Sequence, residues 1–195
     1  MRPENALDKR RFTVRPVADK TDALPLIVAN HYSRGIGNIR RAIFVHGMYR
    51  RDDDDLVGAA VWSNGLPKSV CVFFYPDEWT AVLHLTRLVV APDLPTNAAS
   101  YLLGASVRLV KASGRWRCLA TYADTSQGHT GTIYRATNWE PFGMAAPYAI
   151  WHDADGRLVS DRDQTGRGMS TAEMTARGYH RAGKSAKHRF RMVIG

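Results

Sequence analysis

An almost unbroken run of apolar residues, from Cys118 to Ala123, ends abruptly at Asp124. A strand with one wet face alternates apolar and polar residues, whereas this run predicts a strand that is covered on both faces. A sheet with such a strand needs a layer of structure on each side, which indicates the α/β class. The chain has 195 residues, of which 45% are apolar, and this is enough for one core in a single domain, 1–195.

The other hydrophobic patterns predict a mixed sheet that helices interrupt. Short apolar or alternating runs predict strands at residues 12–17, 40–48, 56–63, 70–75, 81–90 and 189–194, with a last pair of short strands between 139 and 151. Helical periodicity predicts helices at residues 22–30, 97–113 and 126–138. In such sheets ligands bind beyond the carboxyl ends of strands, here after Val90 and Asp124, and at the amino end of the helix that begins at Asn97.

The formal charge of +9 is concentrated at the two ends of the chain. Residues 1–20 carry six Lys and Arg against three acids, residues 156–195 carry nine against three, and residues 21–155 carry twelve of each. We therefore predict a neutral core with a basic leader at 1–11 and a basic C-terminal segment at 157–195. The usual partners of this pattern are polyanions, with nucleic acid first, and the alternative is a tail that only adds solubility.

Several classes of protein are excluded by what the sequence lacks. No apolar run approaches the roughly 18 residues that span a bilayer, and no secretion signal is evident, so we expect a cytoplasmic protein without a membrane partner. Cys71 and Cys118 show no CxxC spacing and are predicted to be reduced, buried thiols. The signatures of dinucleotide and P-loop binding, of nucleophile elbows, of HExxH metalloproteases and of zinc deaminases do not occur.

A dense polar segment follows the buried strand and carries a specific resemblance. The sequence TYADTSQGHTGTIYRATNWEPFG at residues 121–143 is similar to the signature of the phage Mom DNA-modification family. The resemblance extends to HYS at 31–33, LTRLVVAPDLPTNAAS at 85–100 and KHRFRMV at 187–193. These motifs share order as well as residue type and spread over most of residues 30–195.

The resemblance implies a single GNAT-like α/β domain, with a mixed central sheet flanked by helices and with basic N- and C-terminal extensions. It implies a transferase that modifies the exocyclic N6 amine of adenine in double-stranded DNA to a carbamoylmethyl-type adduct. That adduct shields phage DNA from restriction in the cytoplasm of the infected bacterium. The oligomeric state is left open, with a homodimer among the options.

The donor that GNAT enzymes imply is acetyl-CoA, whose pyrophosphate they hold with a glycine-rich loop before the central helix. The corresponding residues 93–100 lack those glycines. We expect the backbone around Asn97 and Ala99 and the hydroxyl of Ser100 to take the place of the loop. Arg87 lies in the middle of a predicted strand, where its charge needs a phosphate or carbonyl ligand or, alternatively, a structural salt bridge. These four residues are the candidate cofactor-binding residues.

The catalytic candidates are Asp124, Tyr134, His31 and Tyr32. Asp124 ends the buried strand where ligands bind, and its alternative role is to cap the following helix. The phenol of Tyr134 suits a general acid that protonates a leaving thiolate, and its alternative role is a core aromatic. His31 and Tyr32 follow the first predicted helix, a position that faces the acceptor in GNAT-like folds. They suit a base and a stacking partner or, with Asp124, the ligands of an iron ion.

The acceptor side has a physical requirement of its own. A duplex hides the adenine amine within the stack, so an enzyme that modifies it must extrude the base at a cost of a few kcal/mol. Contacts between basic side chains and DNA phosphates can offset that cost. The candidate DNA-binding residues are Arg181, Lys184, Lys187 and Arg189.

Two other functions stay open from the sequence. One is a GNAT N-acetyltransferase that acts on a small-molecule or protein amine, against which the basic ends and the lack of an acidic pocket argue. The other is a non-enzymatic DNA-binding protein that has kept the fold. A cleft that gathers Arg87, Asp124 and Tyr134 argues against this second alternative.

Overall fold

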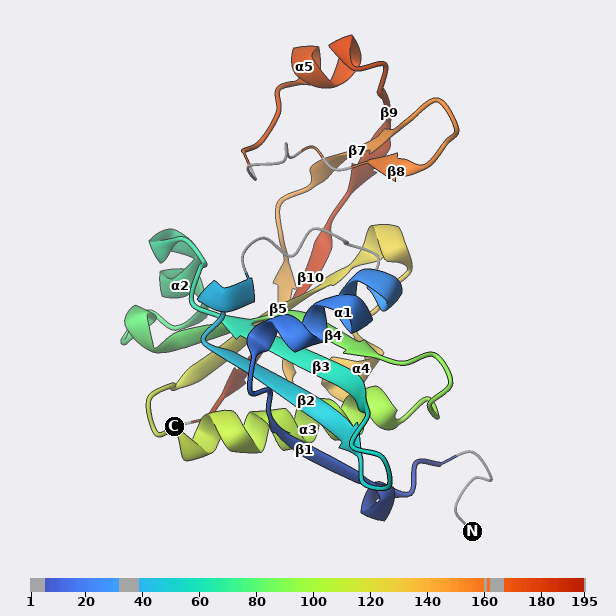
Figure 1. Ribbon diagram of the computed structural model, residues 1–195. Helices are drawn as coiled ribbons and strands as arrows, with labels where there is room; N and C mark the ends of the chain where they lie inside the picture. The colour runs from blue at the N-terminus through green and yellow to red at the C-terminus, as the bar shows by residue number, and fades with distance from the viewer. Residues whose placement is uncertain (1–5, 32–38, 160, 162–166, 195) are drawn as a thin grey trace. The chain divides into compact units, whose positions relative to one another are not determined.

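The computed structural model describes residues 6–31, 39–159, 161 and 167–194, and Figure 1 shows the path of the backbone. The chain divides into two compact units. The first unit consists of residues 1–121, 132–141 and 190–195, and the second unit consists of residues 122–131 and 142–189.

Strands and short helices alternate along the chain, as expected of an α/β protein. The α-helices are α1 (Leu24–Asn30), α2 (Lys68–Phe74), α3 (Ala98–Ala112), α4 (Thr132–Arg135) and α5 (Thr171–Ala176). The strands are β1 (Phe12–Pro16), β2 (Phe44–Arg50), β3 (Leu56–Ser63), β4 (Val82–Val90), β5 (Cys118–Asp124), β6 (Glu140–Met144), β7 (Tyr148–His152), β8 (Leu158–Val159), β9 (His180–Ser185) and β10 (Lys187–Val193). Turns of 3-10 helix are η1 (Lys9–Arg11), η2 (Lys20–Ala23), η3 (Ile39–Arg41), η4 (Trp79–Ala81) and η5 (Thr125–Gln127). Over the described residues, no helix is both long enough and apolar enough to cross a membrane.

Seven strands form one sheet in the order β1-β2-β3-β4-β5-β10-β6. The first four strands are antiparallel neighbours, and β4 then pairs with β5 in parallel. The last strand along the chain, β10, lies between β5 and β6, so the chain leaves the sheet after β6 and returns beside it. This mixed sheet with its helices confirms the predicted α/β class.

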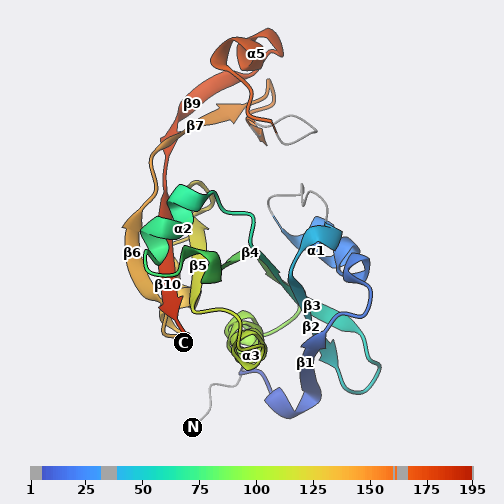
Figure 2. The same cartoon turned by 90° about the vertical axis from the view of Figure 1, so that its left-hand side faces the viewer.

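Helices α1 and α3 cover opposite faces of the sheet, as Figure 2 shows. Gly58 of β3 faces α3, because a Cβ atom at this position would lie 3.0 Å from Cδ2 of Leu102. A glycine therefore lets the helix approach the sheet closely at this point. Ile27 of α1 belongs to the cluster on the other face, together with Val61 of β3.

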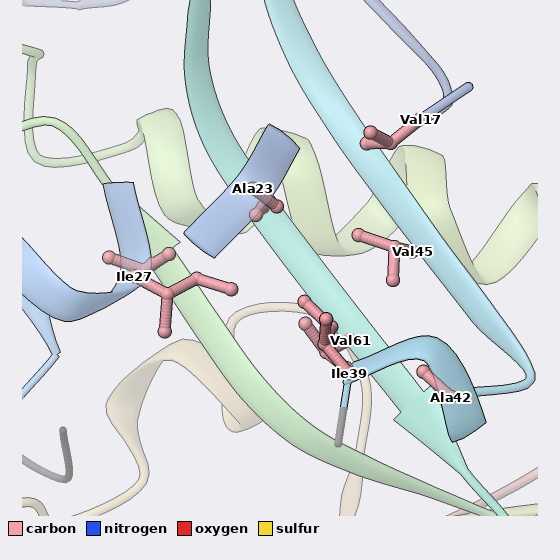
Figure 3. Packing of buried hydrophobic residues seen from close by; sticks show 9 residues of the cluster. Val17, Ala23, Ile27, Ile39, Ala42, Val45 and Val61 are labelled. Atoms are coloured by element: carbon pink, nitrogen blue, oxygen red, sulfur yellow. The ribbon is translucent and has the colours of Figure 1, made fainter. Parts of the chain in front are cut away.

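The face that α1 covers holds a core of small and β-branched side chains, which Figure 3 shows. Ile39 and Val61 belong to it and are 4% and 3% exposed. Branched side chains of this kind pack well on a pleated surface, and their burial is favourable. The other members of the cluster are Val17, Ala23, Ile27, Ala42, Val45, Ala59 and Val89.

The face that α3 covers contains a buried polar network around Ser106. The indole Nε1 of Trp62 donates a hydrogen bond to Ser106 Oγ at 2.7 Å, and His46 Nδ1 lies 2.7 Å from the same oxygen. His46 is 2% exposed, and burial lowers the pKa of its imidazole to about 4. His46 is therefore neutral at pH 7, and the network joins β2 and β3 to the middle of α3.

The second unit has a small sheet of its own, with the strand order β8-β7-β9. Trp151 of β7 and Met174 of α5 are 4% and 0% exposed and supply large buried side chains in this unit. Helix α5 begins with a capping box, in which Ser170 and Glu173 satisfy each other's backbone N–H groups. The described part of the C-terminal segment, 157–195, is thus folded, although its composition is that of a polar tail.

Most of the predicted elements of the first unit are confirmed, but the strand predicted at residues 70–75 is wrong. This segment is the helix α2, and its buried residues are Cys71 and Phe74. Side chains three residues apart lie on one side of a helix. An apolar run of this length is too short for its periodicity to separate a helix from a buried strand.

The predictions for the C-terminal half are wrong in three further places. Gly128 and Gly131 have φ angles of +69° and +80°, so the helix predicted at residues 126–138 is divided into η5 and α4. The two strands predicted between 139 and 151, β6 and β7, do not pair but belong to different sheets. The segment from 157 onward contains β8, α5 and β9 in addition to the predicted final strand.

We predict that His46 makes folding sensitive to mild acid. A histidine whose pKa is lowered in the folded state stabilises fully above its unfolded value of 6.5, and this stability is lost as the pH falls towards about 4. The loss amounts to about 3 kcal/mol in the free energy of unfolding. His46→Asn keeps a polar partner for Ser106 but does not titrate. Denaturant melts at pH 7, 5.5 and 4 should therefore show a weaker pH dependence for the variant, and identical pH dependences would contradict the prediction.

Candidate active site

The parallel ladder between β4 and β5 is short. It ends with His84 opposite Ala120, after three residue pairs. Immediately beyond it, Thr121 Oγ1 donates a hydrogen bond to the carbonyl oxygen of Leu85 at 3.2 Å. β4 continues to Val90 in register with β3. Among the described residues, the part of β4 after Leu85 therefore has a backbone edge that β5 does not pair.

A bulge lies at the same point of β4. The register with β3 passes from Val61 opposite Arg87 to Trp62 opposite Leu85, so Thr86 has no opposite residue. Thr86 Oγ1 donates a hydrogen bond to the carbonyl oxygen of Val61 at 3.0 Å and so closes the bulge. Bulges of this kind redirect the neighbouring side chains. Arg87 lies on the face that α1 covers, because its opposite residue Val61 does.

A cavity of about 350 Å³ lies beside the bulge, on the face of α1. Its lining includes Arg41 of η3, Arg87 of β4, and Ser63 and Asn64 at the end of β3. The guanidinium Nη1 of Arg87 donates a hydrogen bond to the carbonyl oxygen of Thr86 at 2.7 Å, which fixes its orientation. We call this cavity the Arg41–Arg87 pocket.

The other candidate donor residues lie at the start of α3, in contact with the N-terminal leader. The backbone N–H of Leu7 donates to Asn97 Oδ1 at 2.9 Å, and Ser100 Oγ donates to the carbonyl oxygen of Asn97 at 2.9 Å. Ala99 is half-buried in the first turn of the helix, where backbone N–H groups have no intrahelical acceptor. A cavity of about 410 Å³ lies here between Asn97 and residues 6–10.

The structure does not bring all four candidate cofactor-binding residues together. Asn97, Ala99 and Ser100 share the first turn of α3 or its N-cap, and α3 covers one face of the sheet. Arg87 lies on the other face and lines the Arg41–Arg87 pocket. One cavity therefore lies beside β4 on the face of the sheet that α1 covers. A second cavity lies at the start of α3, which follows the end of β4 along the chain.

Asp124, the last residue of β5, is 5% exposed and binds donors with both of its oxygens. Oδ1 accepts hydrogen bonds from the backbone N–H of Ser126 at 3.0 Å, from Ser126 Oγ at 2.7 Å and from the Tyr148 hydroxyl at 2.5 Å. Oδ2 lies 3.2 Å from Nζ of Lys187. Asp124 therefore caps η5, which is the alternative role that the sequence indicated, and it also joins side chains from β7 and β10.

The electrostatics of this network keep Asp124 ionised. Burial by itself raises the pKa of the Asp124 carboxyl group, but the hydrogen bonds from Tyr148 and Ser126 and the ammonium of Lys187 hold this pKa below its ordinary value. Burial, and then the hydrogen bond to Asp124, raise the pKa of Tyr148. An ionised carboxylate whose oxygens already accept these donors is suited to position Tyr148 and Lys187 rather than to take a proton from a substrate.

Tyr134 lies in the first unit, in α4, among aromatic side chains. Its ring centroid is 5.1 Å from that of Phe190 and 5.7 Å from that of Trp139. The phenol oxygen lies 3.4 Å from Thr121 Oγ1, to which the phenol donates because the hydroxyl hydrogen of Thr121 is directed to Leu85. Burial raises the pKa of Tyr134 above its ordinary value, so the phenol keeps its proton at neutral pH. Asp124 belongs to the second unit, and its pairing with Tyr134 stays a prediction.

The predicted iron site has no support among the described residues. His31 follows α1, and its backbone N–H donates to the carbonyl oxygen of Ile27 at 2.8 Å, whereas Tyr32 lies outside the described residues. Over the part of the chain that the structure describes, no three His, Cys, Asp or Glu side chains come together as metal ligands. The carboxylate of Asp124 already binds Lys187, and a cation there would have to displace this ammonium.

The four candidate DNA-binding residues are of two kinds. Arg181 and Lys184 are exposed on β9, an edge strand of the small sheet. Arg181 lies opposite Trp151 of β7 and Lys184 lies opposite Ala149. Since Trp151 and Ala149 are two residues apart on one strand, Arg181 and Lys184 share one face of the small sheet. Lys187 and Arg189 are half-buried on β10, and Lys187 pairs with Asp124. Arg181 and Lys184 are therefore the better placed of the four for contact with a phosphate backbone.

Three features of this geometry were missed in the sequence. Arg41 and Tyr148 carry no local pattern that separates them from ordinary surface residues. Lys187 begins the KHRFRMV motif, which is a signal for its importance, but its position in that motif does not indicate that it binds Asp124.

Comparisons with known proteins agree with this fold. The model of the Mom protein family matches residues 11–194. An acetyltransferase of Bacillus subtilis, solved in complex with CoA, is 14% identical, with a TM-score of 0.56 over 93% of this chain and 98% of that chain. A GNAT family acetyltransferase from Elizabethkingia anophelis with acetyl-CoA bound is 10% identical, with a TM-score of 0.55 over 94% and 98%.

The ribosomal-protein-S18-alanine N-acetyltransferase of Escherichia coli is 12% identical, with a TM-score of 0.52 over 94% of both chains. No curated protein matches the chain. At identities this low, the structural similarity confirms the predicted GNAT fold.

We expect Tyr148→Phe to raise the pKa of the Asp124 carboxyl group, because the variant lacks one of the donors that stabilise the ionised form. The free energy of unfolding at pH 7 should fall by about 1 kcal/mol. Since a lowered carboxyl pKa stabilises only above the unfolded value of about 3.9, this difference should shrink as the pH falls below that value. NMR titration of the carboxyl carbon and thermal melts measure both effects.

Tyr179→Phe is the matched control, because Tyr179 lies in the same unit and none of the hydrogen bonds of Asp124 involves it. An unchanged carboxyl pKa in Tyr148→Phe would remove Tyr148 from the network.

Proposed function

Because this chain belongs to the Mom protein family, we propose that it is a GNAT-like transferase that modifies the exocyclic N6 amine of adenine in double-stranded DNA. The observation that carries the proposal is the match of the family model to residues 11–194. The proposed product is an adduct of the carbamoylmethyl type, and its proposed effect is to protect phage DNA from restriction. Acetyl-CoA would supply only the two carbon atoms of this adduct: the amide nitrogen needs a separate nitrogen donor, whose attack on the thioester releases the CoA thiolate, and the bond between N6 and the methylene carbon needs a two-electron oxidant.

Acetyl-CoA is the proposed donor. Two of the similar structures contain CoA or acetyl-CoA, and the first unit has the features that such a donor needs. The edge of β4 after Leu85 presents backbone N–H groups to a thioester carbonyl. The first turn of α3 presents N–H groups to phosphate, and the small side chain of Ala99 leaves room for it. Lys9 adds a positive charge to the cavity at this turn, where Arg10 forms an ion pair with Asp8.

Tyr134 is the proposed general acid. Its raised pKa keeps a proton on the phenol oxygen, and this proton is available to the thiolate that leaves when the donor reacts. The phenol oxygen lies 3.4 Å from the hydroxyl of Thr121, which donates to Leu85 at the end of the parallel ladder and can accept from the phenol. Tyr134 is thus positioned at the point where β4 and β5 stop pairing, beside the edge of β4 that is proposed to bind the donor.

Asp124 has a positioning role in this proposal. Its carboxylate orients Tyr148 and Lys187 and closes the turn at Ser126. Loss of the carboxylate charge would leave Lys187 without its partner in a half-buried position, which is costly.

The proposed contact with DNA is made by the basic residues of the second unit. Arg181 and Lys184 are exposed on one face of β9, and residues 156–195 carry nine Lys and Arg against three acids. Contacts of this kind attract any duplex and do not read its sequence.

Mass spectrometry of nucleosides tests the function directly. DNA from cells that express the protein should contain a modified deoxyadenosine, and its mass distinguishes a carbamoylmethyl adduct from a simple acetyl amide. Unmodified deoxyadenosine, together with acetylation of a protein or a small amine by the same preparation, would favour an ordinary N-acetyltransferase. DNA binding without either product would favour a binding protein that has kept the fold.

We predict that Tyr134→Phe lowers the yield of modified deoxyadenosine by about 100-fold, the size of a lost acid–base group. The melting temperature should change little, because the phenol oxygen makes only a long hydrogen bond of 3.4 Å to Thr121 and the ring remains. Tyr75→Phe, in the same unit, is the control for removal of a hydroxyl group. A normal yield from the folded Tyr134→Phe protein would show that another group protonates the leaving thiolate.

We predict that the double variant Arg181→Ala/Lys184→Ala binds duplex DNA more weakly and with a flatter dependence on salt. Each phosphate contact that is lost should lower the slope of log affinity against log salt by about 0.9. Arg157→Ala/Arg177→Ala removes the same charge from exposed positions of the second unit outside β9. Fluorescence anisotropy over a range of salt concentrations measures both slopes, and equal slopes for the two double variants would show that β9 is not the contact surface.

A further inference from the structure

The Arg41–Arg87 pocket is separate from the cavity at the start of α3. It lies on the other face of the sheet and is formed by three elements, η3, β3 with the loop after it, and β4. Its volume of about 350 Å³ is within the range of small-molecule sites, roughly 300–1,000 Å³. The pocket therefore has room for a ligand group of its own.

The floor of this pocket is apolar and buried. Ile39, Ala42 and Val61 line it and are 4%, 8% and 3% exposed. The same three side chains belong to the core cluster of Figure 3, in which they are labelled. A wall that is part of the core does not rearrange easily, so the shape of the pocket is set before any ligand binds.

The rim of the pocket is positively charged. Two arginines, Arg41 and Arg87, come from separate elements, and the described residues that line the pocket include no Asp or Glu. Arg87 is held in place by the hydrogen bond from its Nη1 to the backbone of Thr86. Guanidinium groups bind phosphate and carboxylate through charge-assisted hydrogen bonds. Ser63 and Asn64 add a hydroxyl and an amide to the same rim.

We propose that the Arg41–Arg87 pocket binds a nucleotide through its phosphate group. Phosphate takes the arginine rim, and the apolar floor takes the flat face of a base or the sugar carbons. The pocket includes Thr86, the bulge residue at which the unpaired edge of β4 begins, so a bound nucleotide lies beside that edge. The identity of the nucleotide rests on the proposed function, which supplies two sources: a nucleotide of the target DNA and the nucleotide part of CoA.

Binding of dAMP to the full-length protein tests the proposal, with deoxyadenosine as the probe that lacks phosphate. Arg41 is exposed, so Arg41→Gln should fold normally and should bind dAMP at least about tenfold more weakly, while it binds deoxyadenosine as the wild type does. Arg40→Gln is the matched control, because Arg40 is the exposed neighbour in η3 that does not line the pocket. Isothermal titration or NMR chemical shifts measure the affinities.

Three results would overturn the proposal. The first is that the wild type does not bind dAMP at millimolar concentration. The second is that the wild type binds dAMP and deoxyadenosine with equal affinity. The third is that Arg41→Gln and Arg40→Gln lose the same amount of dAMP affinity.

Two further arms identify the source of the nucleotide. If the pocket takes a nucleotide of the target DNA, Arg41→Gln weakens binding of an oligonucleotide duplex at fixed salt and leaves the affinity for CoA unchanged. If the pocket takes the nucleotide of CoA, Arg41→Gln lowers the affinity for CoA, and CoA displaces dAMP from the wild type. Failure of the proposed function is seen separately, because the nucleoside analysis then shows no adduct while the dependence of dAMP binding on Arg41 persists.

Discussion

The parallel ladder between β4 and β5 is only three residue pairs long, and the features of the first unit depend on where it stops. Parallel pairs are slightly less stable per residue than antiparallel ones, so a ladder this short needs support from its surroundings. Helix α3 forms the crossover from β4 to β5, and Ser106 in its middle bonds to Trp62 of β3, the other neighbour of β4. The hydroxyl of Thr121 ends the ladder at Leu85 and bonds onward to Tyr134.

Beyond that point β4 separates two regions of different chemistry. On one face lies the Arg41–Arg87 pocket, with its arginines over an apolar floor. The strand then leads to the start of α3, where the leader packs against Asn97 and backbone N–H groups remain available. A transferase must admit two substrates without letting either occupy the place of the other. In the proposed function, the cavity on the α1 face of β4 and the cavity at the start of α3 would keep the two substrates apart.

The sequence predicted those elements whose pattern is strong and local. The buried strand that ends at Asp124, the strand at residues 56–63 and the long helix α3 are of this kind, and the family signature supplied the GNAT fold. Strand β9 could not be found in this way, because all but one of its residues are exposed and no apolar alternation marks it. The contact of Asp124 with Tyr148 joins residues 24 apart, and only the folded chain shows it.

The position of β10 between β5 and β6 determines where the sheet can accept an inserted segment of different length and sequence. Residues 145–186, which include β9 and its basic side chains, begin and end on two strands that are neighbours in the sheet. Both ends of the insertion are therefore held together by the sheet itself, and its length adds little to the entropy of closing the loop. A different insertion, of another length and charge, can be grafted at Met144 and Lys187 without breaking any strand. The segment that carries these basic side chains can thus be exchanged as a module without a change in the strand order of the seven-stranded sheet.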